Sequence, residues 1–215
     1  EKSFMILENT YPELIQIKNE SELSLIDGPL TKITIGSLPL LYKDGELSQF
    51  KLRLQAKQID IDFWSNKLIQ DSENKSVIGL SLLAGRVGDE FQRVKRTLPI
   101  RPILEVIAKY NITLVDIQHG GHPESLRKMA NEFNIQILEY PGITDDLAQL
   151  SALIKALDGL ITSQQTNAHL CGALGCHGIV FLPIRPHFAY GLGDKSIRYP
   201  TLKLIRSISW TNWDC

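Results

Sequence analysis

The segment from Ser163 to His169, SQQTNAH, has the residue types of an anion site at the start of a helix. A helix that opens at Thr166 and Asn167 turns its first main-chain N–H groups, and the positive end of its dipole, toward a ligand. Hydroxyl and amide side chains at that point can add hydrogen bonds to phosphate oxygens. A second interpretation stays open, because Thr and Asn side chains commonly do no more than cap a helix.

Another set of candidate residues follows the apolar run at 77–82. Gly85 and Gly88 would let the main chain approach a phosphate closely. Basic side chains in this region supply charge for a diphosphate, and arginine can do so with a two-pronged contact. These side chains are Arg86, Arg93, Lys95 and Arg96. A strand-to-helix turn needs glycine in any case, and basic loops are often only solvated, so neither observation is specific for a ligand.

His119 and His122 have the His-x-x-His spacing that can bring two imidazoles to one metal ion. The sequence offers no third ligand at a suitable spacing and neither a CxxC nor an HExxH motif, so we expect no metal site. His169 lies one turn into the helix that opens at Thr166. Its ring could face a ligand or fill the interior.

Three further polar or reactive residues are expected to be structural. Asp116 belongs in or beside a strand, and Cys171 and Cys176 are expected to be small core residues. Nothing near either thiol suggests a Cys–His nucleophile.

Composition narrows the partners and the compartment. The 215 residues carry 23 Lys and Arg against 24 Asp and Glu, for a net charge of −1. This balance argues against nucleic acid as a partner and fits a small anionic ligand. The 3 cysteines have no paired or metal-type spacing, which favours a reducing cytoplasm. We find neither a secretory signal nor an apolar run of about 20 residues that could span a bilayer.

From Ser76 onward, apolar runs alternate regularly with segments of helical periodicity. We expect strands at 77–82, 112–117, 135–138, 160–161 and 178–182. We expect helices at 99–109, 123–133, from Asp145 or Asp146 to about 156, and 167–174. This alternation predicts an α/β fold with a doubly wound, Rossmann-like parallel sheet. In such sheets ligands bind beyond the carboxyl ends of the strands, which are the ends that carry the candidate residues.

Residues before Ser76 have a different pattern. Short strands are expected at 4–7, 14–17 and 32–36, followed by loosely helical spacing from Leu47 to Leu68 and a polar linker at 71–75. We therefore expect a remnant of another domain over 1–70 and a ligand-binding domain over 71–215. Because the chain starts at Glu1 with an apolar strand-like run, we interpret it as a fragment or a processed form.

Several segments, in order, resemble one family. Residues 146–161, DLAQLSALIKALDGLI, with 168–175, AHLCGALG, resemble the "DFADTAALIANLDLVI…AHLAGALG" signature of heptosyltransferase-like glycosyltransferases. These domains are often fused behind tetratricopeptide repeats (TPR). Shorter matches are 78–85 to "VGLVWSG", 96–100 to "RSIPL", 117–118 to "LQ", 198–206 to "WYPTLRLFRQ" and 36–40 to "MSLP".

The resemblance implies the C-terminal, donor-binding half of a two-domain (GT-B) glycosyltransferase, with the tail of its N-terminal domain. It also implies a nucleotide-diphosphate sugar donor, an unknown glycan, lipid or protein acceptor, and transfer without a metal or another cofactor. Carried over by position, and with Arg86 added for its charge, the donor-binding residues would be Gly85, Arg86, Arg96, Gln118, Thr166, Asn167, Ala168 and His169. The resemblance assigns no catalytic residue, because the expected base belongs to the N-terminal half.

Two departures from the family pattern leave alternatives open. Gln164 and Gln165 stand where the family shows Asp-Thr, and the segment 187–190, HFAY, stands where a "DWRW"-like run is usual. Either the donor differs, or the domain is a non-catalytic nucleotide- or sugar-binding module with a regulatory role. This chain alone could then be inactive. A sugar-nucleotide epimerase is disfavoured, because we find no group of carboxylates for its site.

Overall fold

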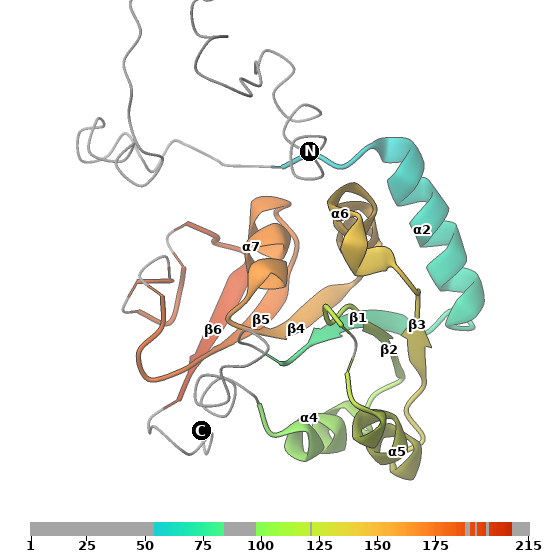
Figure 1. The fold of residues 1–215 in the computed structure, drawn as a ribbon, viewed down its shortest axis with the longest axis horizontal. Coiled ribbons are helices and arrows are strands. Elements are labelled where there is room, and N and C mark those ends of the chain that lie inside the picture. Colours follow the sequence, from blue (N-terminus) through green and yellow to red (C-terminus); the bar gives the residue numbers. More distant parts are fainter. Residues whose placement is uncertain are drawn as a thin grey trace, which may run out of the picture.

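The computed structural model describes residues 54–83, 98–120, 122–187, 190–191, 193–196 and 198–207. Within them, six parallel strands form one sheet in the order β3-β2-β1-β4-β5-β6 (Figure 1). The strands are β1 Ser76–Ser81, β2 Ile112–Asp116, β3 Ile137–Glu139, β4 Gly159–Ser163, β5 Gly178–Leu182 and β6 Leu202–Arg206. The predicted α/β fold with a doubly wound, Rossmann-like parallel sheet is confirmed.

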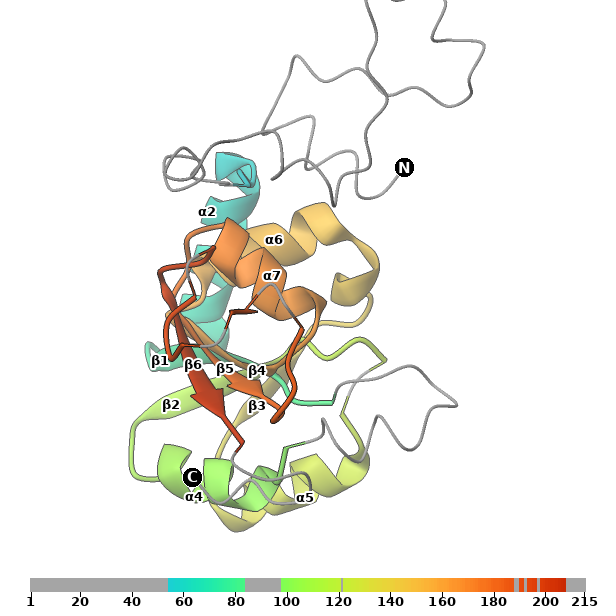
Figure 2. The ribbon, with the colours of Figure 1, turned by 90° about the vertical axis from the view of Figure 1, so that its left-hand side faces the viewer.

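Helices cover both faces of this sheet (Figures 1 and 2). One face carries α2 Gln58–Asp71, α6 Leu147–Ala156 and α7 Thr166–Ala173, and the other carries α4 Ile100–Ile107 and α5 Glu124–Glu132. A short 3-10 turn, η4 Ile143–Asp145, precedes α6. Because helices exclude water from both faces, the central strands are nearly continuous apolar runs, and of β1 only Ser76 is exposed.

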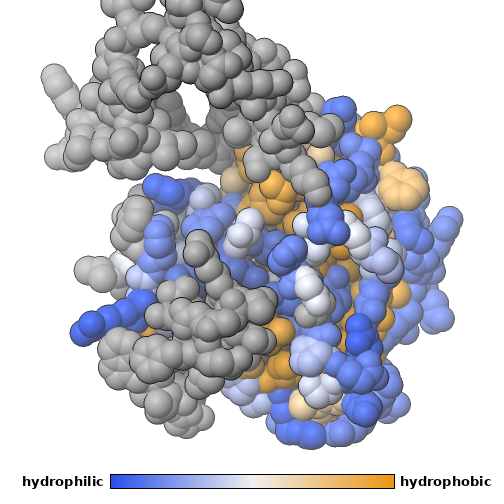
Figure 3. Space-filling view, in the orientation of Figure 1, coloured by the Kyte–Doolittle hydropathy of each residue, from blue (hydrophilic) through white to orange (hydrophobic). Residues whose placement is uncertain are grey.

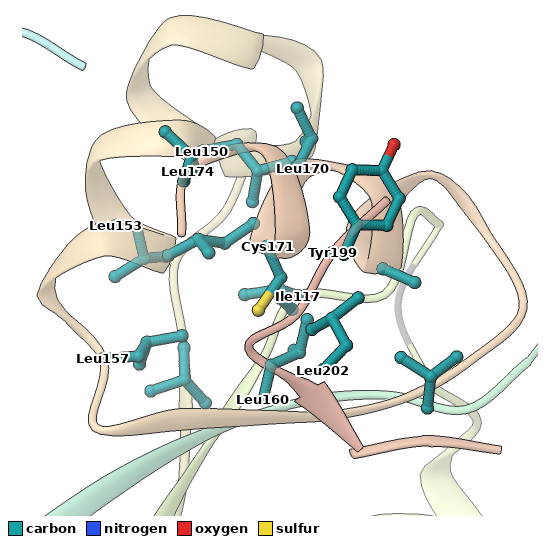
Figure 4. Packing of buried hydrophobic residues seen from close by; sticks show 14 of the residues in the cluster. Ile117, Leu150, Leu153, Leu157, Leu160, Leu170, Cys171, Leu174, Tyr199 and Leu202 are labelled. Carbon is teal, nitrogen blue, oxygen red and sulfur yellow. The ribbon is translucent and has the colours of Figure 1, made fainter. Parts of the chain in front are cut away.

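A separate apolar cluster lies on each face. Between the sheet and helices α6 and α7, Leu153 and Cys171 pack with Leu160 of β4 and Leu202 of β6 (Figure 4). On the opposite face, Leu104 of α4 and other fully buried side chains of α4, α5, β1 and β2 form the second cluster. Packing on two faces fixes the strands and their carboxyl ends relative to one another, and the described candidate residues follow those ends.

Two helix ends follow the chemistry of their residues. Asp146 caps α6, because its Oδ1 accepts hydrogen bonds from the N–H groups of Ala148 (2.9 Å) and Gln149 (3.1 Å). This settles the choice between Asp145 and Asp146. Gly175 ends α7 with φ +69°, and the N–H groups of Gly175 and Cys176 return to the carbonyls of Gly172 and Cys171.

The edge strand β6 is a correction to the sequence analysis, which placed the last strand at 178–182. Leu202 and Leu204 are buried, whereas Lys203 between them is exposed. An alternating segment of 5 residues with two basic side chains lacks the apolar continuity of the inner strands. Its pairing with β5 places it in the sheet. The strand expected at 135–138 is also shifted, since β3 begins at Ile137.

Helix α2 runs across the proposed division at 70/71 and packs on α6. Trp64 and Leu68 are buried in the same cluster as α6, and the Trp64 Nε1–H donates to Gln149 Oε1 (3.0 Å). The hydroxyl of Tyr140 donates to Asp71 Oδ2 (2.8 Å) at the end of α2. The strands expected at 4–7, 14–17 and 32–36 lie outside the described residues, so a separate domain over 1–70 stays a prediction.

The outer surface over α2 is mainly hydrophilic, with apolar side chains at its upper end (Figure 3). Ile59, Phe63 and Ile69 of this helix are 76%, 57% and 52% exposed. Within the described residues, no helix combines the length and the apolar character needed to cross a bilayer.

Candidate functional site

The strand order reverses between β1 and β4: strands β2 and β3 are added on one side of β1, and β4 to β6 are added on the other. The segment after β1 leads to α4 on one face, whereas β4 leads to α7 on the other (Figures 1 and 2). Connections that leave for opposite faces open a crevice at the carboxyl ends of the two strands, and doubly wound folds bind ligands there. Gln118, Thr166, Asn167, Ala168 and His169 all come from segments that begin at this edge.

The start of α7 presents main-chain N–H groups at this edge. Thr166 is the first helical residue and is exposed. The earliest bond of the helix is donated by the N–H of Ala168 to the carbonyl of Gln165 (3.1 Å). The N–H groups of Thr166 and Asn167 precede that bond, so they are the donors that a helix start leaves for a ligand or for water. Gln165 occupies the cap position without a side-chain capping bond, so Thr166 and Asn167 do not serve as caps.

Asn167 ties the helix to two strands. Its Nδ2 donates to Ser81 Oγ (2.9 Å) and to the carbonyl of Ile117 (2.8 Å), and the residue is 5% exposed. Both protons of the amide therefore point into the sheet edge. The structure thus shows a structural contact for the side chain that the sequence analysis expected at the phosphates.

The two glutamines that replace Asp-Thr also bind the protein itself. Gln165 Nε2 donates to the carbonyl of Ser81 and to Ser163 Oγ (3.2 Å). Gln164 Oε1 accepts from the N–H of His187 (2.6 Å). These amides join β4 to β1 and to the segment after β5. The threonine that the family shows at position 165 has no side-chain amide to donate to the carbonyl of Ser81, so this strand-end contact depends on Gln165.

Gln118 holds the segment that leaves β1. Its Oε1 accepts from the N–H of Leu83 (2.9 Å), and its Nε2 donates to the carbonyl of the same residue (3.0 Å). Ser81 Oγ donates to the same Oε1 (3.3 Å). Both functional atoms of the expected donor-binding side chain are thus engaged with the main chain and with Ser81.

Asp116 and His122 form a buried pair beside it. Asp116 Oδ1 lies 2.8 Å from His122 Nδ1 and accepts the N–H of Gln118 (2.8 Å), while Oδ2 accepts the N–H of His122 (3.0 Å). Burial raises the pKa of Asp116, but the hydrogen bonds from His122 and from the main chain outweigh burial and leave the pKa below its ordinary value. Sequence spacing predicted a buried Asp116 but not its partner.

His169 lies between two tyrosines. Its Nδ1 is 3.2 Å from the hydroxyl of Tyr199, and its Nε2 is 3.4 Å from the hydroxyl of Tyr190. Burial lowers the pKa of His169, and the nearby His187 and Arg198 lower it further. The ring is therefore neutral near pH 7 and half-buried, a state that lies between the two alternatives of the sequence analysis. Nothing in the sequence pairs these tyrosines with His169.

The remaining candidate residues are placed as follows. The methyl group of Ala168 is fully buried in the core, so only its main chain is near the edge. Gly85, Arg86 and Arg96 lie outside the described residues, and their donor-binding role stays a prediction. Cys171 is fully buried, as expected, and burial raises the pKa of its thiol to about 12. In the described part of the chain, no group of three His, Cys, Asp or Glu side chains could hold a metal ion.

Comparison with solved structures identifies proteins of similar fold. A glycosyl transferase family 9 protein from Veillonella parvula superposes with a TM-score of 0.50 over 73% of this chain, at 12% identity. The described part of this chain therefore shares its α/β fold with part of that protein. The ADP-heptose lps heptosyltransferase II of Escherichia coli has a TM-score of 0.48 over the same share, at 20% identity. The match covers 42% and 46% of those two chains, so this chain spans less than half of each. No protein-family profile and no curated protein matches it.

Proposed function

We propose that this chain is the nucleotide-binding part of a glycosyltransferase. It binds a nucleotide-diphosphate sugar at the carboxyl edge of the sheet and serves transfer of the sugar to an acceptor. The supporting observation is the start of α7, which presents the N–H groups of Thr166 and Asn167 at the point where the strand order reverses, between the parallel neighbours β1 and β4. Phosphate groups are the anions that such a helix start favours.

In this proposal catalysis depends on the leaving group. As the bond between the sugar and the diphosphate breaks, negative charge grows on the departing phosphate oxygen. Main-chain N–H groups at the start of α7 stabilise that charge without reorganising, because the helix already holds them in place. The neutral His169 lies one turn further along, where its two ring nitrogens engage the hydroxyls of Tyr199 and Tyr190 and fix them beside the donor site. The base that activates the acceptor is supplied from outside the described residues.

A substitution at Thr166 tests the helix start directly. Proline is tolerated at the first helical position and removes one N–H, and Gln165 before it is already extended (φ −158°, ψ −176°). Isothermal calorimetry with ADP, GDP, UDP, CDP and dTDP identifies the preferred nucleotide for the unaltered chain. We expect Thr166→Pro to weaken its binding by about tenfold, the loss typical of one charge-assisted hydrogen bond. Thr166→Ala, which keeps the N–H, is the control. Absence of binding for every nucleotide would remove the proposal.

A second candidate function is a non-catalytic nucleotide- or sugar-binding module. The contacts of Gln164 and Gln165 favour it, because both amides are used to join strand ends and neither position offers a carboxylate. Nucleotide binding without donor hydrolysis or sugar transfer, measured on the complete gene product with a panel of nucleotide sugars, would support the module. Turnover that disappears in His169→Ala would exclude it. The GT-B half assignment, the TPR association and the cytoplasmic location stay predictions.

A further inference from the structure

At the carboxyl edge of the sheet, His122 is the histidine with the most deeply buried side chain. Its side chain is 1% exposed and lies between the end of β2 and the end of β1. The Nδ1 atom is 2.8 Å from Asp116 Oδ1, and the Nε2 atom is 3.2 Å from the main-chain nitrogen of Leu82. An imidazole with both nitrogens engaged in this way has no lone pair for a metal ion.

These two contacts determine where the ring proton is. An ionised carboxylate can only accept, so Nδ1 carries the proton and donates it to Asp116. A main-chain N–H can only donate, so Nε2 must be the acceptor for Leu82. The ring is therefore neutral and in one tautomer, with Asp116 selecting the tautomer that Leu82 requires.

Leu82 and Leu83 are the first two residues beyond β1, and both are held by side chains that follow β2. His122 binds the N–H of Leu82, and Gln118 binds the N–H and the carbonyl of Leu83. Three hydrogen bonds from two side chains thus fix the main chain at the point where it leaves the sheet. That point lies at the carboxyl end of β1, beside β4, the strand that leads to α7.

We propose that His122 is a positioning residue, which holds the N–H of Leu82 and with it the main chain of residues 82–83 so that the β1 side of the nucleotide site has one defined shape. This inference rests on the proposed function for its consequence, but its structural part does not depend on a ligand. Asp116 acts through His122: it accepts the proton of Nδ1, which leaves Nε2 as the acceptor for the N–H of Leu82.

Two substitutions of His122 separate the roles of the two ring nitrogens. In His122→Gln the side-chain oxygen can take the place of Nε2 and accept from Leu82. In His122→Asn the shorter amide can donate to Asp116 but does not reach Leu82. His177→Asn is the matched control, because His177 is exposed and lies before β5 at the opposite edge of the sheet.

Amide hydrogen exchange and calorimetry on the full 215-residue chain give the two readouts. We expect the Leu82 amide to exchange about tenfold faster in His122→Asn than in His122→Gln, as for loss of one ordinary hydrogen bond. We expect nucleoside diphosphate binding to weaken more in His122→Asn than in His122→Gln. The affinity of His177→Asn should equal that of the unaltered chain. Nitrogen NMR shifts of the His122 ring, measured without any substitution, should show a protonated Nδ1.

The outcomes distinguish this inference from the proposed function. Equal exchange at Leu82 in the Asn and Gln variants, or a ring protonated at Nε2, overturns the positioning role whatever the nucleotide does. Equal nucleotide affinity in the two variants, with different Leu82 exchange, overturns the link to the site. If no nucleotide binds the unaltered chain, the proposed function fails, while the exchange and the tautomer still decide whether His122 holds Leu82.

Discussion

The ring of Tyr199 lies directly against the α-carbon of Gly172. A Cβ atom at Gly172 would stand 2.3 Å from Cγ of Tyr199, which is closer than any real contact. Helix α7 and the segment before β6 can approach this closely only because position 172 has no side chain. The contact places the hydroxyl of Tyr199 at His169, one turn earlier on the same helix.

We predict that Gly172→Ala destabilises the fold by about 2–3 kcal/mol, because the added methyl group meets a buried ring in a packed core. Urea unfolding at pH 7 measures the change. Gly193→Ala is the matched control, since a Cβ there meets nothing nearer than 3.9 Å. A loss below 0.5 kcal/mol, on the order of a surface substitution, would contradict the packing described here.

Asp116 should make stability depend on pH. Its pKa is held below the ordinary 3.8, so its contribution is present above about pH 4 and is lost as the pH falls through the folded pKa. We predict that Asp116→Asn lowers the free energy of unfolding by roughly 1–3 kcal/mol at pH 7, through the loss of accepted hydrogen bonds. Below pH 4, the free energies of unfolding of Asp116→Asn and of the unaltered chain should become more similar. A difference that stays constant down to pH 3 would show that the carboxylate charge has no such role. Asp145→Asn, an exposed site, serves as the control.

The cap of α6 offers a test within two neighbouring residues. Asp146→Ala removes the acceptor for Ala148 and Gln149, and we expect it to cost about 1 kcal/mol of stability. Asp146→Asn keeps an acceptor oxygen and should retain most of that stability. Thermal unfolding of these variants beside Asp145→Ala makes the comparison. An equal effect of alanine at 145 and 146 would argue against the capping bonds.

Substitutions at Thr166 and Asn167, adjacent at the start of α7, should affect nucleotide affinity and folding stability differently. Asn167→Asp replaces a donor with an acceptor opposite the carbonyl of Ile117, and we expect a loss of about 2–3 kcal/mol of folding stability. Thr166→Asp puts the same charge on an exposed first-turn position, where the helix dipole favours it, so stability should stay the same or rise. Nucleotide binding should instead weaken in Thr166→Asp, because two negative groups meet at the helix start. Urea unfolding and calorimetry measure the two effects, and unchanged affinity in Thr166→Asp would place the phosphates elsewhere.

Periodicity and local chemistry along the chain determined the fold class, and they predict the edge at which a ligand binds. The alternation from Ser76 onward predicted the doubly wound sheet, and Asp146 and Gly175 are found at the expected ends of their helices. These features are accessible from sequence because they depend on hydrogen bonds and apolar spacing within a few residues.

Only the tertiary structure decided which polar side chains at that edge hold the protein together. Asn167 reaches Ser81 and Ile117, His122 reaches Leu82, and Tyr199 closes on Gly172. Each of these partners is separated by tens of residues, so nothing in local spacing reveals the pairing. The edge strand β6 was missed for the same reason, since its place in the sheet comes from pairing with β5 rather than from its own short, half-polar pattern. The amide and imidazole groups that could have bound a ligand are instead bound by strand ends, because packing brings those ends together.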